Sequence, residues 1–188
     1  TIEEWVDIHT ECGHDHGLDR KQGQTAYWYR NIGAQVRLIG LDTVNRFGGW
    51  QGCIHREQFE WLRELLKESQ DKYVVLSSHH PLDNLFNGYV PDGEQEPALE
   101  KEVRELIEQY PNVILWFSGH VHDHKIQESK RADGRHAFWE IRTGSHIDWP
   151  QQSRIIEIMK VENDQIVIGT SIIDHAGPLQ FIGSPEEL

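Results

Sequence analysis

Short apolar segments alternate with amphipathic segments of helical period through the middle of this 188-residue chain. Residues 35–42, 73–78 and 113–118 are short and apolar, which is the pattern of buried strands. Between them, apolar residues recur at the spacing of one helix face over roughly 55–69 and again over 99–110. Strands and helices that alternate in this way form β-α-β crossovers with parallel pairing, so the sequence predicts an α/β fold.

The pattern changes from residue 137 onward. Three apolar segments, 137–144, 154–161 and 165–173, follow one another with no helical segment between them. Asn163-Asp164 forms a tight-turn signal between the last two segments, so we predict a β-hairpin with a neighbouring strand. The expected fold is therefore a mixed sheet with antiparallel C-terminal strands.

The first 34 residues carry little periodicity and several glycines. We predict a long loop there, with one short strand near 26–30. The chain is short enough for one domain, so we divide it into a loop-rich lead-in, 1–34, and a single domain, 35–188.

Acidic residues outnumber basic ones, 31 against 18, which gives a formal net charge of −13. Such a field repels nucleic acid and anionic lipid, so we expect no nucleic-acid partner. It also repels a small phosphorylated substrate unless metal ions reverse the local sign. No apolar run approaches the ~20 residues that cross a bilayer, so we expect a soluble chain with no membrane span. Because the sequence starts at Thr1, we expect that a leader or upstream region has been removed, and export stays open.

Two loops rich in histidine follow the ends of predicted strands. The first reads SSHHP, Ser77 to Pro81, and the second reads SGHVH, Ser118 to His122. Open α/β sheets place their ligands at the carboxyl ends of their strands. Two adjacent parallel strands would therefore bring His79 near His120.

Alternate side chains of an extended segment point the same way, so His120 and His122 would face one point while Val121 turns back to the core. Imidazole nitrogen is a good ligand for zinc, iron and manganese. The pattern therefore predicts His79, His120 and His122 as metal ligands.

The other polar residues of these loops have more than one interpretation. His80 would point away from His79, so it either orients a ligand or is structural. His124 continues the alternate spacing, but it lies in a charged loop, where a solvated histidine is the favoured interpretation. Further candidates for orienting a ligand or contacting substrate, chosen by position, are Asp42, Asp83, Asn84 and Arg154.

The SSHHP and SGHVH stretches, in this order, resemble the last two motifs of the calcineurin-like metallophosphoesterases. The stretches GLDT, GGWQG and EQFEWLRELL resemble the segments before the His-Pro motif in that superfamily. The segment 143–158 resembles the one after Gly-His-x-His, especially in a bacterial branch. The resemblance runs from about Gln35 to Ile173, and it implies the C-terminal portion of a β-sandwich flanked by helices.

By this resemblance the complete site holds two divalent metal ions, which are manganese, iron or zinc. His79 and His120 would serve one ion and His122 the other. A hydroxide between the ions would attack the phosphorus of a small phosphomonoester or phosphodiester.

The family also has upstream Asp-x-His, Gly-Asp-x-x-Asp and Gly-Asn-His motifs, which this sequence lacks. GHDHG at 13–17 has the wrong order and spacing, and a polar loop is the better interpretation. We therefore expect the C-terminal part of a phosphoesterase, inactive alone, which self-associates through an open strand edge or pairs with a separate N-terminal half. The alternative is a non-catalytic binding or assembly module.

Overall fold

The computed structural model describes residues 1–11, 25–148 and 151–174 of the chain. Its helices are α1 (Ile2–Glu11), α2 (Arg56–Lys67) and α3 (Glu100–Ile107), with 3₁₀ turns η2 (Leu82–Asn84) and η3 (Glu162–Asp164). Its strands are β1 (Trp28–Ile32), β2 (Val36–Leu41), β3 (Tyr73–Ser78), β4 (Val113–Ser118), β5 (Lys125–Lys130), β6 (His136–Arg142), β7 (Ser153–Lys160) and β8 (Ile166–Ile173).

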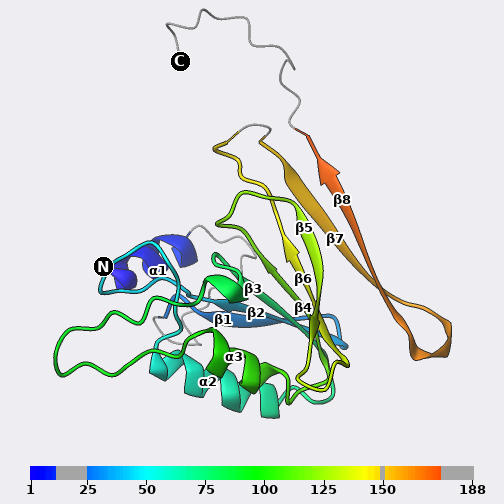
Figure 1. Ribbon diagram of the computed structural model, residues 1–188. Coiled ribbons are helices and arrows are strands. Elements are labelled where there is room, and N and C mark those ends of the chain that lie inside the picture. The colour runs from blue at the N-terminus through cyan, green and yellow to red at the C-terminus, as the bar shows by residue number, and fades with distance from the viewer. Residues whose placement is uncertain (12–24, 149–150, 175–188) are drawn as a thin grey trace, which may run out of the picture.

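Six strands form one mixed sheet in the order β1-β2-β3-β4-β6-β5, and β7 and β8 form a separate hairpin (Figure 1). The four central strands run parallel, whereas β1 and β5 pair antiparallel at the two edges. The α/β class, the parallel pairing of the first three predicted strands and the antiparallel C-terminal hairpin are confirmed.

Helices α2 and α3 cover one face of the sheet. Leu62 and Leu66 of α2 and Ile107 of α3 are fully buried against the sheet residues Leu76 and Trp116. Each such side chain contributes about 1.5–3 kcal/mol when it is fully removed from water. This packing fixes the two crossovers, and with them the order of β2, β3 and β4.

The β7–β8 hairpin lies over the opposite face. Ile156 and Ile158 of β7 pack with Val75 and Leu115 of the sheet in a second, smaller cluster. The outward face of the hairpin is not covered by the described part of the chain, and it exposes several apolar side chains: Ile155, Met159, Val167 and Ile173. The second layer of the fold is therefore two strands wide among the described residues.

The segment expected beside the hairpin belongs to the main sheet instead. As β6 it pairs parallel with β4 and antiparallel with β5. The strand β5 was not predicted, because KIQESK contains a single apolar side chain, Ile126, and so carries no alternating pattern. An edge strand can be this polar because one of its two sides faces solvent.

The expectation of a loop before β1 is wrong for the first residues, which form helix α1. The Thr1 hydroxyl accepts a hydrogen bond from the Glu4 backbone N–H at 3.2 Å, which caps the helix. The strand predicted near 26–30 is confirmed as β1, and the division of the chain at residue 34 stays a prediction. None of the helices in the described part of the chain is both long enough and apolar enough to cross a membrane.

Buried Glu140 makes stability depend on pH. Burial raises the pKa of this carboxyl, against the attraction of nearby Arg104 and Arg142. An acid whose pKa is raised on folding loses stability as pH climbs from its ordinary range through the raised value. We expect Glu140→Gln to raise the free energy of unfolding at pH 8 and to lose this advantage near pH 4. Urea titrations across that range, with Glu157→Gln as a surface control, measure the effect; an equal gain in both variants at every pH would contradict it.

Candidate metal centre

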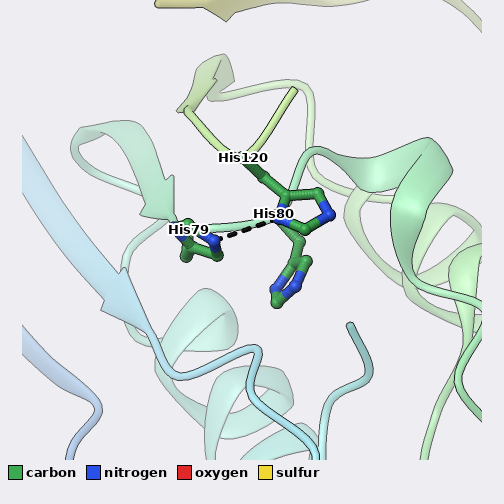
Figure 2. A group of neighbouring side chains, drawn as sticks. All are labelled: His79, His80 and His120. Carbon is green, nitrogen blue, oxygen red and sulfur yellow. Dashed lines mark hydrogen bonds between the residues drawn. The ribbon is translucent and has the colours of Figure 1, made fainter. Parts of the chain in front are cut away.

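The ends of β3 and β4 bring the two histidine loops together. These strands are parallel neighbours; His79 directly follows β3, and His120 follows β4 after one residue, Gly119. The Gly119 backbone N–H donates a hydrogen bond to the His79 carbonyl oxygen at 3.0 Å. Their side chains then meet above the sheet edge (Figure 2), so the predicted proximity of the two loops is confirmed.

His79 and His120 face each other with the geometry of two ligands of one ion. His79 Nε2 and His120 Nδ1 are 3.1 Å apart. Two nitrogen ligands of a tetrahedral zinc ion, each about 2.0–2.1 Å from the metal, lie about 3.3 Å apart. Partial burial is the largest cause that lowers the pKa of both imidazoles; the neighbouring imidazoles add to it, His122 for His79, and His79 followed by His122 for His120. Both rings are therefore neutral near pH 7, which is the state that binds metal, so the pair fits a divalent ion.

His80 lies beside this pair, with its ring centroid 4.3 Å from that of His120, but both of its nitrogens are used within the protein. Its Nε2 donates to the Trp50 carbonyl oxygen at 3.0 Å, and its Nδ1 accepts from the Thr43 hydroxyl at 2.8 Å. Burial lowers the pKa of His80 to about 4. Although its nitrogens lie within 4.8 Å of those of His79 and His120, this ring fits the structural interpretation and not a ligand role.

His122 reaches the site by a different backbone path from the one predicted. His120 and His122 both lie in the left-handed region, with φ of 65° and 58°, so the segment is not extended. Val121 is 41% exposed and does not turn into the core. Left-handed backbone costs about 1–2 kcal/mol per residue, and such strain concentrates at functional sites. The His122 Nδ1 donates to the Asp148 carboxylate, which leaves Nε2 available to a metal.

His124 is exposed but hydrogen-bonded. Its Nδ1 accepts from Arg154 Nη2 at 3.0 Å, and its Nε2 donates to the Gln152 side chain at 2.8 Å. Arg154 also donates to the Thr170 hydroxyl at 2.7 Å. His124 is therefore exposed, as predicted, and it also contacts Arg154.

A cavity of about 780 Å³ opens at the histidine pair, between the main sheet and β7. His79, His120, His122 and Arg154 line its polar part. Apolar side chains of the sheet and hairpin line the rest, among them Val36, Leu38, Val75, Phe117 and Ile156. The arrangement can hold a cation at one end and an anionic molecule in the adjoining space.

Among the described residues, the remaining candidate side chains do not contact these histidines. Asp83 forms an ion pair with Arg142, and the Asn84 side chain donates to Gln51 at 3.0 Å. Asp42 accepts from the Val44 backbone N–H at 3.0 Å within its own turn. Neither aspartate contacts a candidate ligand histidine among the described residues, so their proposed role in orienting one stays a prediction, and GHDHG at 13–17 lies outside the described residues.

Sequence reasoning missed three residues that support the histidines. They are Thr43 and Trp50, which hold His80, and Asp148, which holds His122. The Trp50 ring also stacks on His120 with centroids 5.9 Å apart. Each contact joins segments far apart in the sequence, so no local pattern indicates it.

The model of the family described as calcineurin-like phosphoesterase matches residues 7–124, which is more than half of the chain. The chain belongs to the calcineurin-like phosphoesterase family. The match includes both histidine loops, and it begins and ends earlier than the resemblance read from the motifs.

Curated relatives match about half of this chain. A manganese-dependent ADP-ribose/CDP-alcohol diphosphatase of Oryza sativa is 33% identical over 53% of the chain and 29% of its own length. A probable glycerophosphodiester phosphodiesterase of Arcobacter nitrofigilis is 30% identical over 46% and 31%. The uncharacterised protein YvnB of Bacillus subtilis is 30% identical over 50% and 7%. The aligned segment is thus less than a third of each relative.

A crystal structure of a dimetal phosphatase from Danio rerio is also similar, with a TM-score of 0.46 and 16% identity. The similarity covers 67% of this chain and 51% of that one.

Metal binding distinguishes the roles of the three neighbouring histidines. We expect His79→Ala and His120→Ala each to weaken Zn²⁺ or Mn²⁺ binding at least about tenfold, because each removes a ligand. We expect His80→Gln to change that affinity less than about threefold while it lowers the free energy of unfolding by about 1–3 kcal/mol. Calorimetric titration measures the metal affinity, and urea unfolding measures the stability. If His80→Gln were the only one of the three variants to lose metal binding, the assignment of the ligands would be reversed.

Proposed function

We propose that this chain carries part of the active site of a metal-dependent phosphoesterase, whose complete form hydrolyses a phosphomonoester or phosphodiester at a dinuclear centre. The observation that supports this most is the contact between His79 and His120 at the ends of two parallel strands, in a chain of the calcineurin-like phosphoesterase family. His79 and His120 would hold one divalent ion and His122 the other, as the motifs predict.

Bound ions would supply Lewis acidity and a nucleophile at neutral pH. The chain's own residues set the orientation and the protonation of the histidines at this end of the cavity. Asp148 fixes the proton of His122 on Nδ1, and Thr43 keeps His80 from turning toward the site. Because partial burial keeps His79 and His120 uncharged, they do not repel a cation.

Arg154 is the residue we propose as the contact for the substrate's anionic group. In a chain of net charge −13, arginines such as Arg46, Arg56 and Arg63 pair with glutamates. Among the described residues, Arg154 bonds to His124 and Thr170 and to no carboxylate, and it lines the same cavity as the histidines. A guanidinium without a carboxylate partner keeps its charge for phosphate oxygens.

Hydrolysis of p-nitrophenyl phosphate and bis(p-nitrophenyl) phosphate with Mn²⁺ tests this function, in the complete product of the gene and in this chain. We expect activity in the complete product, and we expect kcat to be at least about 100-fold lower in its His120→Ala variant. Arg154→Met is expected to raise KM about tenfold with a smaller effect on kcat. Arg46→Met, which breaks a surface ion pair, is the control. Full activity in His120→Ala would refute the proposed function.

One observation favours the non-catalytic alternative for the chain taken alone. The described residues that gather as a potential metal group are His79, His80 and His120, and no carboxylate joins them. A dinuclear centre needs ligands that bridge or complete both ions. We therefore propose that this chain by itself binds metal more readily than it turns over substrate.

We also propose that the open second layer is completed by self-association or by a missing N-terminal half of the protein. The unpaired edge of β7 and the exposed Ile155 and Met159 beside it support this. We expect sedimentation velocity to show concentration-dependent association. Ile155→Lys and Met159→Lys are expected to reduce this association, and Val44→Lys is expected to leave it unchanged. A monomer at every concentration would contradict self-association.

A further inference from the structure

We propose that Arg142 is a positioning residue that clamps the two histidine loops together and so sets the separation of the His79 and His120 rings. Its link to metal binding rests on the proposed function, whereas its link to loop structure does not. Arg142 is the last residue of β6 and pairs in register with Ser118, the last residue of β4. It therefore stands at the sheet edge where both histidine loops begin.

The guanidinium reaches one carboxylate just beyond the end of each loop. Its Nη2 donates to Asp83, which follows His79 by four residues. Its Nη1 is 3.9 Å from Asp123, the residue directly after His122. The Arg142 side chain is 8% exposed, so this is a buried cation with one anionic partner on each side.

The positive charge of Arg142 is what would hold the neighbouring carboxylates together. Asp83 and Asp123 share the Arg142 guanidinium, and Asp83 and Arg142 both act on the buried Glu140, which Arg104 also attracts. Without the Arg142 cation, Asp83 and Asp123 would lose their shared partner and repel each other at low dielectric. Asp83 lies in the turn η2 just after the first histidine loop and Asp123 lies just after the second, so the two loops are the parts that would separate.

One hydrogen bond reports directly on that separation. The Gly119 N–H donates to the His79 carbonyl oxygen, so it joins the two loops at their first residues. If Arg142 holds the loops in register, removing its charge opens this bond more often. The exchange rate of the Gly119 amide with solvent deuterium measures the opening, with no metal present.

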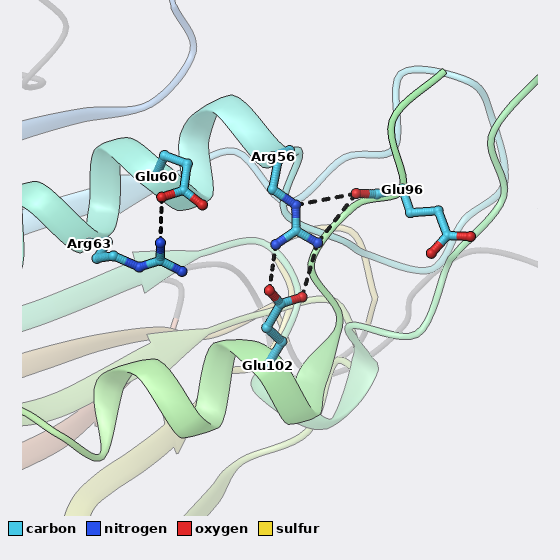
Figure 3. Close-up of polar contacts among 5 residues, drawn as sticks. All are labelled: Arg56, Glu60, Arg63, Glu96 and Glu102. Atoms are coloured by element: carbon cyan, nitrogen blue, oxygen red, sulfur yellow. Dashed lines mark hydrogen bonds and ion pairs between the residues drawn. The ribbon is translucent and has the colours of Figure 1, made fainter. Parts of the chain in front are cut away.

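The chain offers a matched control in Arg56. This arginine pairs through both Nη atoms with Glu102 and donates to the Glu96 carbonyl oxygen (Figure 3). The pair joins α2 to α3, and the Arg56 side chain is 22% exposed. Replacing Arg56 removes a partly buried arginine–carboxylate ion pair, as replacing Arg142 does, but neither partner of this pair lies in a histidine loop.

The first measurement is amide exchange in the metal-free chain. We expect Gly119 to exchange at least about tenfold faster in Arg142→Met and in Asp83→Asn than in the wild type, and within about twofold of it in Arg56→Met. Asp83→Asn breaks the same pair from its exposed end, so the comparison holds even where Arg142→Met folds poorly. Unchanged Gly119 exchange in Asp83→Asn would overturn the clamp.

The second measurement is the affinity for Zn²⁺ and Mn²⁺. Residues that orient metal ligands typically change affinity by about 10–100-fold when removed, and we expect a loss in that range for Arg142→Met. Arg142→Lys should recover part of it, because an ammonium keeps the charge but cannot span both carboxylates. We expect Arg56→Met to bind metal as the wild type does while it melts at a lower temperature.

The two measurements separate the failures of the two proposals. A wild-type chain that binds neither ion overturns the proposed metal function, and the clamp is then judged by Gly119 exchange alone. Metal binding that is equal in the wild type and in Arg142→Met overturns the positioning role.

Discussion

The parallel pairing of β3 and β4 is the constraint on which the histidine site depends. The two strands are separated in the sequence by a helical crossover, and their pairing aligns their ends. Both histidine loops therefore begin at the same edge of the sheet. The Gly119 to His79 hydrogen bond continues that pairing one residue into the loops. The helices matter to the site because their burial on the other face, through residues such as Leu66 and Ile107, keeps these strands adjacent.

The parts of the fold that follow a strong period could be predicted from the sequence. The helix α2 and the strands β3 and β4 each show one apolar face or run, and their order alone placed His79 beside His120. Strand β5 lacked such a pattern, so its hairpin with β6 was not predicted, although Asp133-Gly134 is a turn signal and Gly134 has φ of 82°. Helix α1 likewise begins with Thr1 and Glu4, a capping pair that could have revealed it.

The details of the site could not be predicted, because they depend on contacts between distant segments. His80 is fixed by Thr43 and Trp50, which lie 37 and 30 residues before it. The pattern His-x-His suggested an extended segment, yet His120 and His122 adopt left-handed backbone that no periodicity indicates. The side chains of both residues still line the cavity, and the ligand identities expected from the motifs stay a prediction.

The tryptophan-containing loop before α2 has a consequence for how this protein can vary. Gly52 packs directly on the His80 ring, where an added Cβ would lie 2.7 Å from Cγ. The limit on this position comes from an imidazole in another loop, since its own backbone does not require glycine. Any larger residue there would push on His80 and, through the peptide bond, on His79. The spacing of the His79 and His120 rings thus depends in part on this loop, which contacts His120 through Trp50 and acts on His79 through His80.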